Sequence, residues 1–207
     1  PAPLGGERRQ GFVGLLEPRK NLATLIQAFA RLKNLHRDYC LVLAGEFGWD
    51  SQYLLGALTD CGVRDCVHFP GFVPDDELPE LYNLAEVFVY PSLYEGFGLP
   101  VLEAMACGVP VITSNVSSMP EVAGGAGLLV NPASVEDLSQ AMYRVLTDDG
   151  LRTRMREKGL ERSRLFSWEK MARETLEVYR EVVRQNSAAR SSEREATAGA
   201  AGIHERS

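Results

Sequence analysis

Residues 87–111 read VFVYPSLYEGFGLPVLEAMACGVPV, and this stretch decides the fold. Its first four residues are apolar, β-branched or aromatic, which is typical of a buried strand. A glycine loop follows, and residues 99–107 favour a helix that has Pro100 in its first turn and ends before Gly108. A second apolar strand starts at Pro110. The order strand, glycine loop, helix, strand predicts a parallel α/β unit with both faces of its sheet covered.

The same alternation extends in both directions from this unit. It predicts six strands, at residues 11–16, 39–44, 66–69, 87–90, 110–113 and 127–130. Between and after the strands it predicts helices at residues 21–35, 51–61, 75–85, 99–107, 134–146, 149–164 and 168–185. The predicted fold is therefore α/β: a doubly wound, Rossmann-like parallel sheet of about six strands with helices on both faces.

Length and composition limit the domain organisation. A chain of 207 residues can form one sizeable core but not two full α/β domains. Residues 1–10 are rich in Pro, Gly and Arg and are predicted to form a linker or mobile arm, followed by one globular domain over residues 11–185. Residues 186–207 have no apolar face and are predicted to form a disordered tail. Because the chain begins with Pro1, we expect it to be a fragment or a processed product.

Charge and cysteine content exclude several classes of function. The net charge of −6 argues against a nucleic-acid or anionic-membrane surface. No apolar run has the length of a membrane span, and no signal peptide opens the chain. The four cysteines are scattered without a Cys-x-x-Cys pair, so no metal site is predicted. We expect reduced thiols and a cytoplasmic location.

Polar or glycine-rich segments follow five of the predicted strands. They are residues 17–21, 45–50, 71–75, 92–99 and 114–121. Because the carboxyl ends of parallel strands meet at one edge of the sheet, where such folds bind ligands, these segments are expected to converge on one site.

The chemistry of this edge suits an anion that carries hydroxyl groups. Backbone N–H groups at Gly98 and Leu99, together with the positive end of the helix dipole, can hold a phosphate. Glu95 and Glu103 can accept hydrogen bonds from sugar hydroxyls on either side of it. Adjacent cations after the first strand (Arg19 and Lys20) can neutralise a diphosphate.

The string from Glu95 to Val111 resembles the signature of the family-4 retaining glycosyltransferases of the GT-B fold, and the resemblance covers roughly residues 11–185. It implies that this domain is the C-terminal, nucleotide-sugar-binding half of such an enzyme. The implied reaction moves a hexose from a nucleoside-diphosphate sugar to a hydroxyl acceptor with retention of configuration, as in polysaccharide biosynthesis. It implies neither a metal ion nor another cofactor.

The resemblance also implies roles for individual residues. Glu103 would bind the ribose hydroxyls, and Glu95 would hold donor-sugar hydroxyls near the reacting carbon. Lys20 would stabilise the leaving diphosphate. In many family members an arginine stands about six residues before that lysine, where this chain has Gly14 and Leu15, so we expect Arg19 to stand in. The backbone amides expected to grip the sugar and diphosphate are those of Gly96, Phe97, Gly98 and Leu99.

Two further segments are weaker candidates. Gly45 and Glu46 would lie at the floor of the cleft. The backbone of Phe72 and Val73 would line a pocket for the nucleobase, since an apolar slot with backbone donors and acceptors suits a flat base.

A GT-B active site lies between two domains, and the acceptor-binding half is absent from this sequence. The acceptor, a sugar or glycolipid, would bind through that missing N-terminal domain, which could also bring the enzyme to a membrane surface. The isolated domain is expected to bind donor with little or no transfer. The alternatives are a binding-only nucleotide-sugar module or partner subunit without catalysis, and another GT-B enzyme such as a sugar-nucleotide epimerase.

Overall fold

The structure is a computed structural model that describes residues 8–13, 16–35, 39–48 and 52–201. The chain divides into two units, Pro1–Leu165 and Phe166–Ser207. The predicted domain over residues 11–185 therefore spans parts of both, and each unit is described by itself.

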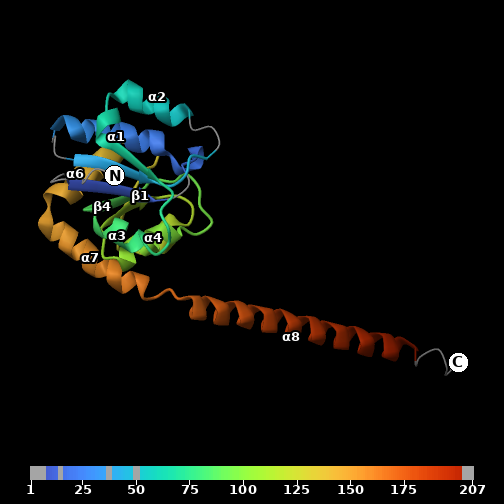
Figure 1. The fold of residues 1–207 in the computed structure, drawn as a ribbon. Helices are drawn as coiled ribbons and strands as arrows, with labels where there is room; N and C mark the ends of the chain where they lie inside the picture. The colour runs from blue at the N-terminus through green and yellow to red at the C-terminus, as the bar shows by residue number, and fades with distance from the viewer. Residues whose placement is uncertain (1–7, 14–15, 36–38, 49–51, 202–207) are drawn as a thin grey trace. The chain divides into compact units, whose positions relative to one another are not determined.

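The first unit is built on a six-stranded parallel sheet (Figure 1). Its strands are β1 (Arg8–Val13), β2 (Tyr39–Ala44), β3 (Val67–Gly71), β4 (Val87–Tyr90), β5 (Val111–Ser114) and β6 (Leu128–Val130). The strand order is β3-β2-β1-β4-β5-β6, in which the direction of winding reverses between β1 and β4. The predicted doubly wound α/β fold is confirmed.

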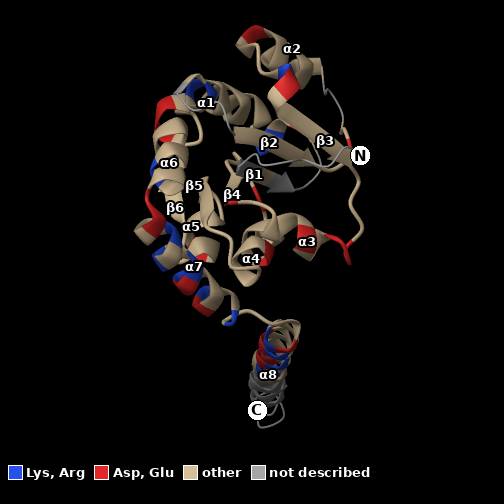
Figure 2. Ribbon diagram, turned by 60° about the vertical axis from the view of Figure 1, so that its left-hand side comes forward, with Lys and Arg blue, Asp and Glu red and all other residues tan. Residues whose placement is uncertain are grey.

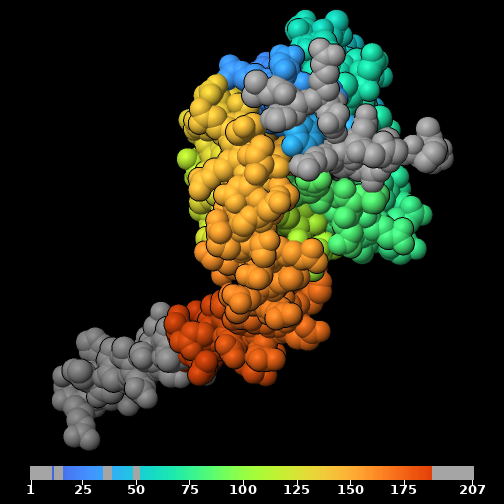
Figure 3. Space-filling view, turned by 90° about the vertical axis from the view of Figure 1, so that its left-hand side faces the viewer, coloured from blue at the N-terminus to red at the C-terminus, as the bar shows by residue number. Residues whose placement is uncertain are grey.

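Helices cover both faces of the sheet. They are α1 (Leu22–Leu35), α2 (Gln52–Cys61), α3 (Leu78–Asn83), α4 (Leu99–Ala106), α5 (Met119–Ala123), α6 (Val135–Thr147) and α7 (Asp149–Ser163), with single turns of 3₁₀ helix, η1 (Pro18–Lys20) and η2 (Arg64–Cys66). Helix α1 packs against α2 and α6, whereas α4 packs against α3, α5 and α7 (Figure 2). Figure 3 shows α6 and α7 along one outer face, where basic and acidic residues alternate on α7 (Figure 2).

The core lies between these two layers and explains the strand sequences. Every residue of β2, β4 and β5 is buried, because helices cover both faces of the sheet. Phe88 on β4 packs against Tyr82 of α3 and Tyr90 at the end of the same strand. The Ser134 hydroxyl accepts a hydrogen bond from Asp137 N (3.0 Å), so Ser134 is the N-cap of α6.

The first strand lies earlier in the chain than predicted. β1 begins at Arg8, so the predicted linker over residues 1–10 is wrong for 8–10, and the predicted strand at 11–16 is about three residues late. The reason is backbone pairing: Arg8 to Val13 pair one to one with Tyr39 to Ala44 of β2, and polar side chains do not interrupt such pairing. Residues 1–7 and 14–15 lie outside the described residues, and Leu16 forms an isolated bridge with Phe47.

The second unit contains one helix, α8 (Trp168–Ala201). The Ser167 hydroxyl accepts a hydrogen bond from Lys170 N (3.1 Å) and so caps the start of the helix. The helix continues well beyond Gln185, where a disordered tail was predicted, and residues 202–207 lie outside the described residues. The tail has no apolar face, but it is rich in Ala, Arg and Glu, which favour helix without tertiary contacts. Apolar side chains near the start of α8, Trp168 and Tyr179 among them, are exposed.

None of the helices in the described part of the chain combines the length and apolar character that a membrane crossing requires. The four cysteines, all of which lie in the described part of the chain, form no disulfide with one another.

Candidate functional site

The loops that follow the strands converge at the carboxyl-end edge of the sheet. Leu93, in the loop after β4, donates its N–H to the carbonyl of Arg19, in the loop after β1 (2.9 Å). Gly45, after β2, donates to the carbonyl of Gly71 at the end of β3 (2.8 Å). This confirms the predicted convergence for the loops after β1 and β4, which meet at the switch point, whereas the loops after β2 and β3 are bonded to each other.

One asparagine joins the loops after β1, β4 and β6. Asn21 ends η1 in the left-handed conformation (φ 59°). Its side-chain amide donates to the carbonyls of Pro91 (3.1 Å) and Pro132 (2.7 Å), and its Oδ1 accepts from the Thr24 hydroxyl (2.7 Å). Asparagine tolerates this backbone conformation better than most residues. The amide thus fixes η1, with Arg19 and Lys20, against the loop that carries Glu95.

Glu95 lies at the centre of a cluster of four donors. Its Oε1 accepts hydrogen bonds from Lys20 Nζ (2.6 Å), the Tyr90 hydroxyl (2.9 Å) and the Ser92 hydroxyl (2.9 Å). Its Oε2 accepts from Arg19 Nη1 (2.7 Å). Lys20 Nζ also donates to the Tyr90 hydroxyl and lies over the Tyr90 ring. These four donors replace the water that would hydrate the Glu95 carboxylate at the surface, so its charge is compensated although it is buried.

Electrostatics keep Glu95 ionised. Burial alone raises the pKa of this carboxyl, but the hydrogen bonds and positive charges of Lys20 and Arg19 outweigh it and hold the pKa below its usual value. Burial also raises the pKa of Tyr90, and the adjacent Glu95 raises it further, so the phenol stays protonated and acts as a donor.

The two cations differ in their access to solvent. The Lys20 side chain is only 6% exposed, whereas that of Arg19 is 46% exposed and also pairs with Glu17. Lys20 is therefore held inside the protein by Glu95. Arg19 is the cation of this pair that presents donors at the surface.

Two serines after β5 hold the glycine loop. The Ser117 hydroxyl accepts from Glu95 N (3.1 Å) and donates to Glu95 O (2.7 Å), with Ser117 itself at a positive φ of 58°. The Ser118 hydroxyl lies 3.1 Å from Glu95 O and 2.8 Å from Phe97 O. The loop carbonyls are thus bound from one side.

Three backbone amides of the same loop have no hydrogen-bond partner among the described residues. Within the described residues, the N–H groups of Gly96, Gly98 and Leu99 donate to no protein acceptor. Gly98 has a φ of 108°, a backbone conformation that other residues rarely adopt, and a Cβ there would force Met119 Cε to shift, so glycine is favoured at this position. Unpaired amides at the start of α4 are what an anion site at a helix N-terminus needs.

Glu103 lies one turn into α4 and is exposed. Its Oε2 accepts a hydrogen bond from the hydroxyl of Tyr82 on α3 (2.8 Å). The two glutamates of the motif are therefore each bound by a buried tyrosine, Tyr90 for Glu95 and Tyr82 for Glu103.

The weaker candidates occupy the same edge of the sheet, and among the described residues no hydrogen bond joins them to the Glu95 cluster. Gly45 follows β2 at a φ of 135°, and the carbonyl of exposed Glu46 accepts from Leu16 N (2.9 Å). Phe72 is exposed and Val73 is half-buried after β3. Their roles at the cleft floor and the nucleobase pocket stay predictions.

Sequence reasoning missed the residues that position this site. The sequence indicated only the type of backbone structure at these positions: a helix at Tyr82, a strand at Tyr90 and a loop at Asn21. The one signal for them was indirect: a hydroxyl or amide group on an otherwise apolar or tightly turned segment needs a partner when buried.

The described residues contain no group of three or more His, Cys, Asp or Glu side chains that could hold a metal ion. Metal independence stays a prediction.

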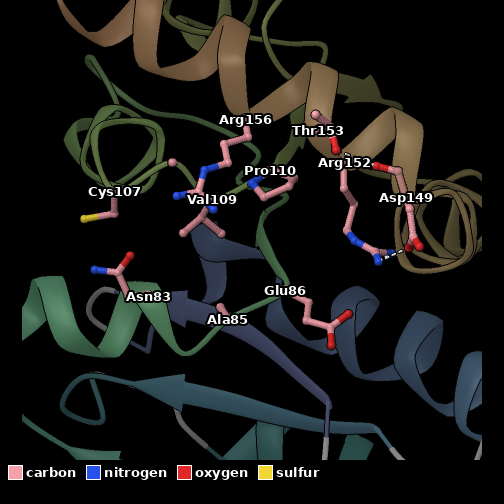
Figure 4. Close-up of a pocket in the computed structure, with 11 residues that line it drawn as sticks. Asn83, Ala85, Glu86, Cys107, Val109, Pro110, Asp149, Arg152, Thr153 and Arg156 are labelled. Atoms are coloured by element: carbon pink, nitrogen blue, oxygen red, sulfur yellow. Dashed lines mark hydrogen bonds and ion pairs between the residues drawn. The ribbon is translucent and has the colours of Figure 1, made fainter.

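A separate hollow of about 300 Å³ lies at the opposite edge of the sheet, beside the starts of β4 and β5 (Figure 4). Arg152 within it pairs with Asp149 and donates to the carbonyls of Val145 (3.0 Å) and Leu146 (2.7 Å) at the end of α6. None of the predicted site residues lines this hollow. It is distinct from the candidate site.

The sequence model of the family "Glycosyl transferases group 1" matches residues 4–162. The chain belongs to this family. One relative of this group 1 glycosyltransferase is the "O-antigen chain mannosyltransferase B" of Escherichia coli, which is 45% identical over 171 residues. The aligned region covers 82% of this chain and 45% of the relative. The chain thus spans less than half the length of that relative.

Solved structures agree with this membership. The sucrose-phosphate synthase of Thermosynechococcus elongatus matches with a TM-score of 0.77 and 33% identity, over 87% of this chain and 46% of that one. The C-terminal domain of a group 1 glycosyltransferase (LpcC) from Francisella tularensis matches with a TM-score of 0.68 and 27% identity, over 76% of this chain and 84% of that domain. The GT-B resemblance predicted from the sequence is therefore confirmed.

Proposed function

We propose that this chain is the donor-binding half of a retaining glycosyltransferase that moves a hexose from a nucleoside-diphosphate sugar to a hydroxyl acceptor. The observation that carries the proposal is the cluster of Lys20, Arg19 and Glu95 directly beside the unpaired amides of the glycine loop. Cations, free amides and a helix N-terminus in one place suit a diphosphate. Mannose is the proposed hexose, because the name of the E. coli relative is that of a mannosyltransferase.

The two cations of the cluster, Arg19 and Lys20, would have different roles. Arg19 is the surface cation and would exchange one of its carboxylate contacts for the diphosphate. Buried Lys20 would stabilise the negative charge that grows on the leaving diphosphate, held in place beforehand by Glu95 and Tyr90. Because these groups are already oriented, little reorganisation is needed at the moment of bond cleavage.

Glu95 has limited capacity left for a sugar. A carboxylate offers about four lone-pair sites, and three donors already occupy Oε1. Its Oε2, with Arg19 as the donor bound to it, is the oxygen that would meet a donor-sugar hydroxyl. Retention of configuration at the reacting carbon is part of this proposal and rests on the family resemblance.

The acceptor, a sugar or glycolipid, would bind through an N-terminal domain outside this sequence. The part of the E. coli mannosyltransferase that does not align with this chain is long enough for such a domain. A cytoplasmic location, with the second domain at a membrane surface, belongs to the same proposal. We therefore expect donor and nucleotide binding by the 207-residue chain, with little or no transfer.

Isothermal titration of the chain with UDP, GDP and ADP tests the proposal directly. We expect at least one of them to bind. Arg19→Ala should weaken that binding roughly tenfold, because one charge-assisted hydrogen bond contributes about a factor of ten to the affinity. Arg31→Ala is the matched control, because Arg31 also pairs with a glutamate (Glu136) but lies on α1. Binding of none of the three diphosphates, or an equal loss in both variants, would contradict the proposal.

Metal independence has its own test. We expect the affinity for the bound diphosphate to change less than twofold between buffers containing Mg²⁺ and EDTA, because the cations and amides of the site neutralise the charge themselves. Loss of binding in EDTA, restored by Mg²⁺, would show that the site needs a metal.

A further inference from the structure

Tyr82 is buried in the core with its hydroxyl directed at one surface carboxylate. It lies on α3 with 2% of its surface exposed, and its ring packs edge to face on Phe88, with ring centroids 5.3 Å apart. Its hydroxyl donates to Glu103 Oε2 (2.8 Å). Burial, and then the neighbouring Glu103 carboxylate, raise the pKa of Tyr82, so the hydroxyl keeps its proton and remains a donor.

Glu103 is the exposed partner of this pair. An exposed glutamate on a helix ordinarily samples many side-chain rotamers and gains little from settling in one of them. Here a rigid, buried phenol binds one carboxylate oxygen and thereby selects a rotamer. Within the described part of the chain, Glu103 Oε1 accepts no hydrogen bond from protein. One oxygen is fixed and the other is left for a ligand.

We propose that Tyr82 is a positioning residue for nucleotide recognition, which orients the Glu103 carboxylate so that its remaining lone pairs accept hydrogen bonds from the ribose hydroxyls of the bound nucleotide. This inference rests on the proposed function, because it takes a ribonucleoside diphosphate as the ligand. Ordering the carboxylate before the ligand arrives removes a cost that binding would otherwise meet.

Tyr82→Phe removes the hydroxyl alone and keeps the ring on Phe88. The test compares the affinities of the variant and the unmodified chain for two probes, namely whichever of UDP, GDP and ADP binds best and its 2′,3′-dideoxy form. We expect the variant to lose roughly five- to tenfold in affinity for the ribonucleotide, the factor that corresponds to ordering one flexible side chain on binding. Affinity for the dideoxy form should stay within about twofold, because it has no hydroxyl for Glu103 to bind.

A merely structural role would give a different result. A loosened α3–α4 contact would lower the affinity for both probes equally. An equal loss of affinity for both, or no loss for either, overturns the proposal. Tyr39→Phe is the matched control: it removes a similarly buried phenol at the start of β2, and its ratio of ribonucleotide to dideoxy affinity should equal that of the unmodified chain.

The unmodified chain separates the two proposals. If it binds the ribonucleotide and the dideoxy form equally, the inference on Tyr82 fails and the proposed function stands. If it binds no diphosphate at all, the proposed function fails and takes this inference with it.

A second measurement needs no Tyr82 variant. A buried hydroxyl bonded to a carboxylate gives a slowly exchanging proton signal by NMR. We expect this signal in the unmodified chain, and we expect it to disappear in Glu103→Ala, a change at an exposed position. Absence of the signal from the unmodified chain would overturn the proposal even if Tyr82→Phe does not fold.

Discussion

Replacing Lys20 by methionine should destabilise the first unit far more than the loss of a surface charge would. The substitution keeps the length and apolar stem of the side chain but removes the ammonium that lies 2.6 Å from Glu95 Oε1. Breaking a buried ion pair costs about 3–5 kcal/mol. Glu95 keeps Arg19, Tyr90 and Ser92 as donors, so we expect the lower end, about 3 kcal/mol.

Urea unfolding and thermal unfolding measure this loss. For a unit of this size, about 3 kcal/mol corresponds to a fall of roughly 6–12 °C in melting temperature. Arg31→Met is the control, because it breaks an ion pair whose side chains are 53% and 59% exposed, and such pairs contribute only about 0.2–1 kcal/mol.

A double-mutant cycle isolates the interaction itself. Lys20→Met combined with Glu95→Gln should lose less stability than the sum of the two single variants, by about 1–3 kcal/mol. Additive losses, or a Lys20→Met variant no less stable than Arg31→Met, would refute the view that this cluster is a coupled, buried unit.

Two further predictions follow from the same loop. Because the pKa of Glu95 in the folded chain lies below its ordinary value, its stabilising contribution is present above about pH 4.3 and is lost as the pH falls below that; the melting temperature should therefore drop steeply below about pH 4.3, and less steeply in Lys20→Met. A pH profile of equal slope in both proteins would argue against this. Gly98→Ala should cost about 1–3 kcal/mol in urea unfolding, because its φ is 108° and a Cβ would meet Met119, whereas Gly56→Ala, inside α2 with nothing within 4 Å, should be neutral or stabilising. Equal changes in the free energy of unfolding for the two substitutions would contradict the view that the positive φ of Gly98 favours glycine.

Local patterns predicted the bounds of two completely buried strands. β2 and β4 begin and end at the predicted residues, because every side chain in them is apolar or aromatic and is buried. β1 did not follow, since its first residues are polar and its extent is fixed by pairing with β2. The end of α8 was missed for a related reason: helix propensity alone extends it, and the prediction relied on an apolar face.

The site was predictable in outline but not in its connections. The rule that ligands bind at the carboxyl edge of a parallel sheet located the loops, and the glycine motif located the amides. The bonds of Glu95 to Lys20 and of Glu103 to Tyr82 join residues 75 and 21 positions apart. Such pairs depend on how the loops are placed in space, which no local spacing encodes.

The bonds of Asn21 limit how this domain can be recombined with its relatives. A chimera that joins the β1–β3 half of one protein to the β4–β6 half of another would separate the Asn21 amide from the carbonyls of Pro91 and Pro132 that it was matched to. We therefore expect a breakpoint between β3 and β4 to keep these hydrogen bonds only where both parents carry an asparagine at this position and the same backbone path after β4 and β6. In directed recombination of these transferases, residue 21 belongs with the second half of the sheet, although it lies in the first half of the sequence.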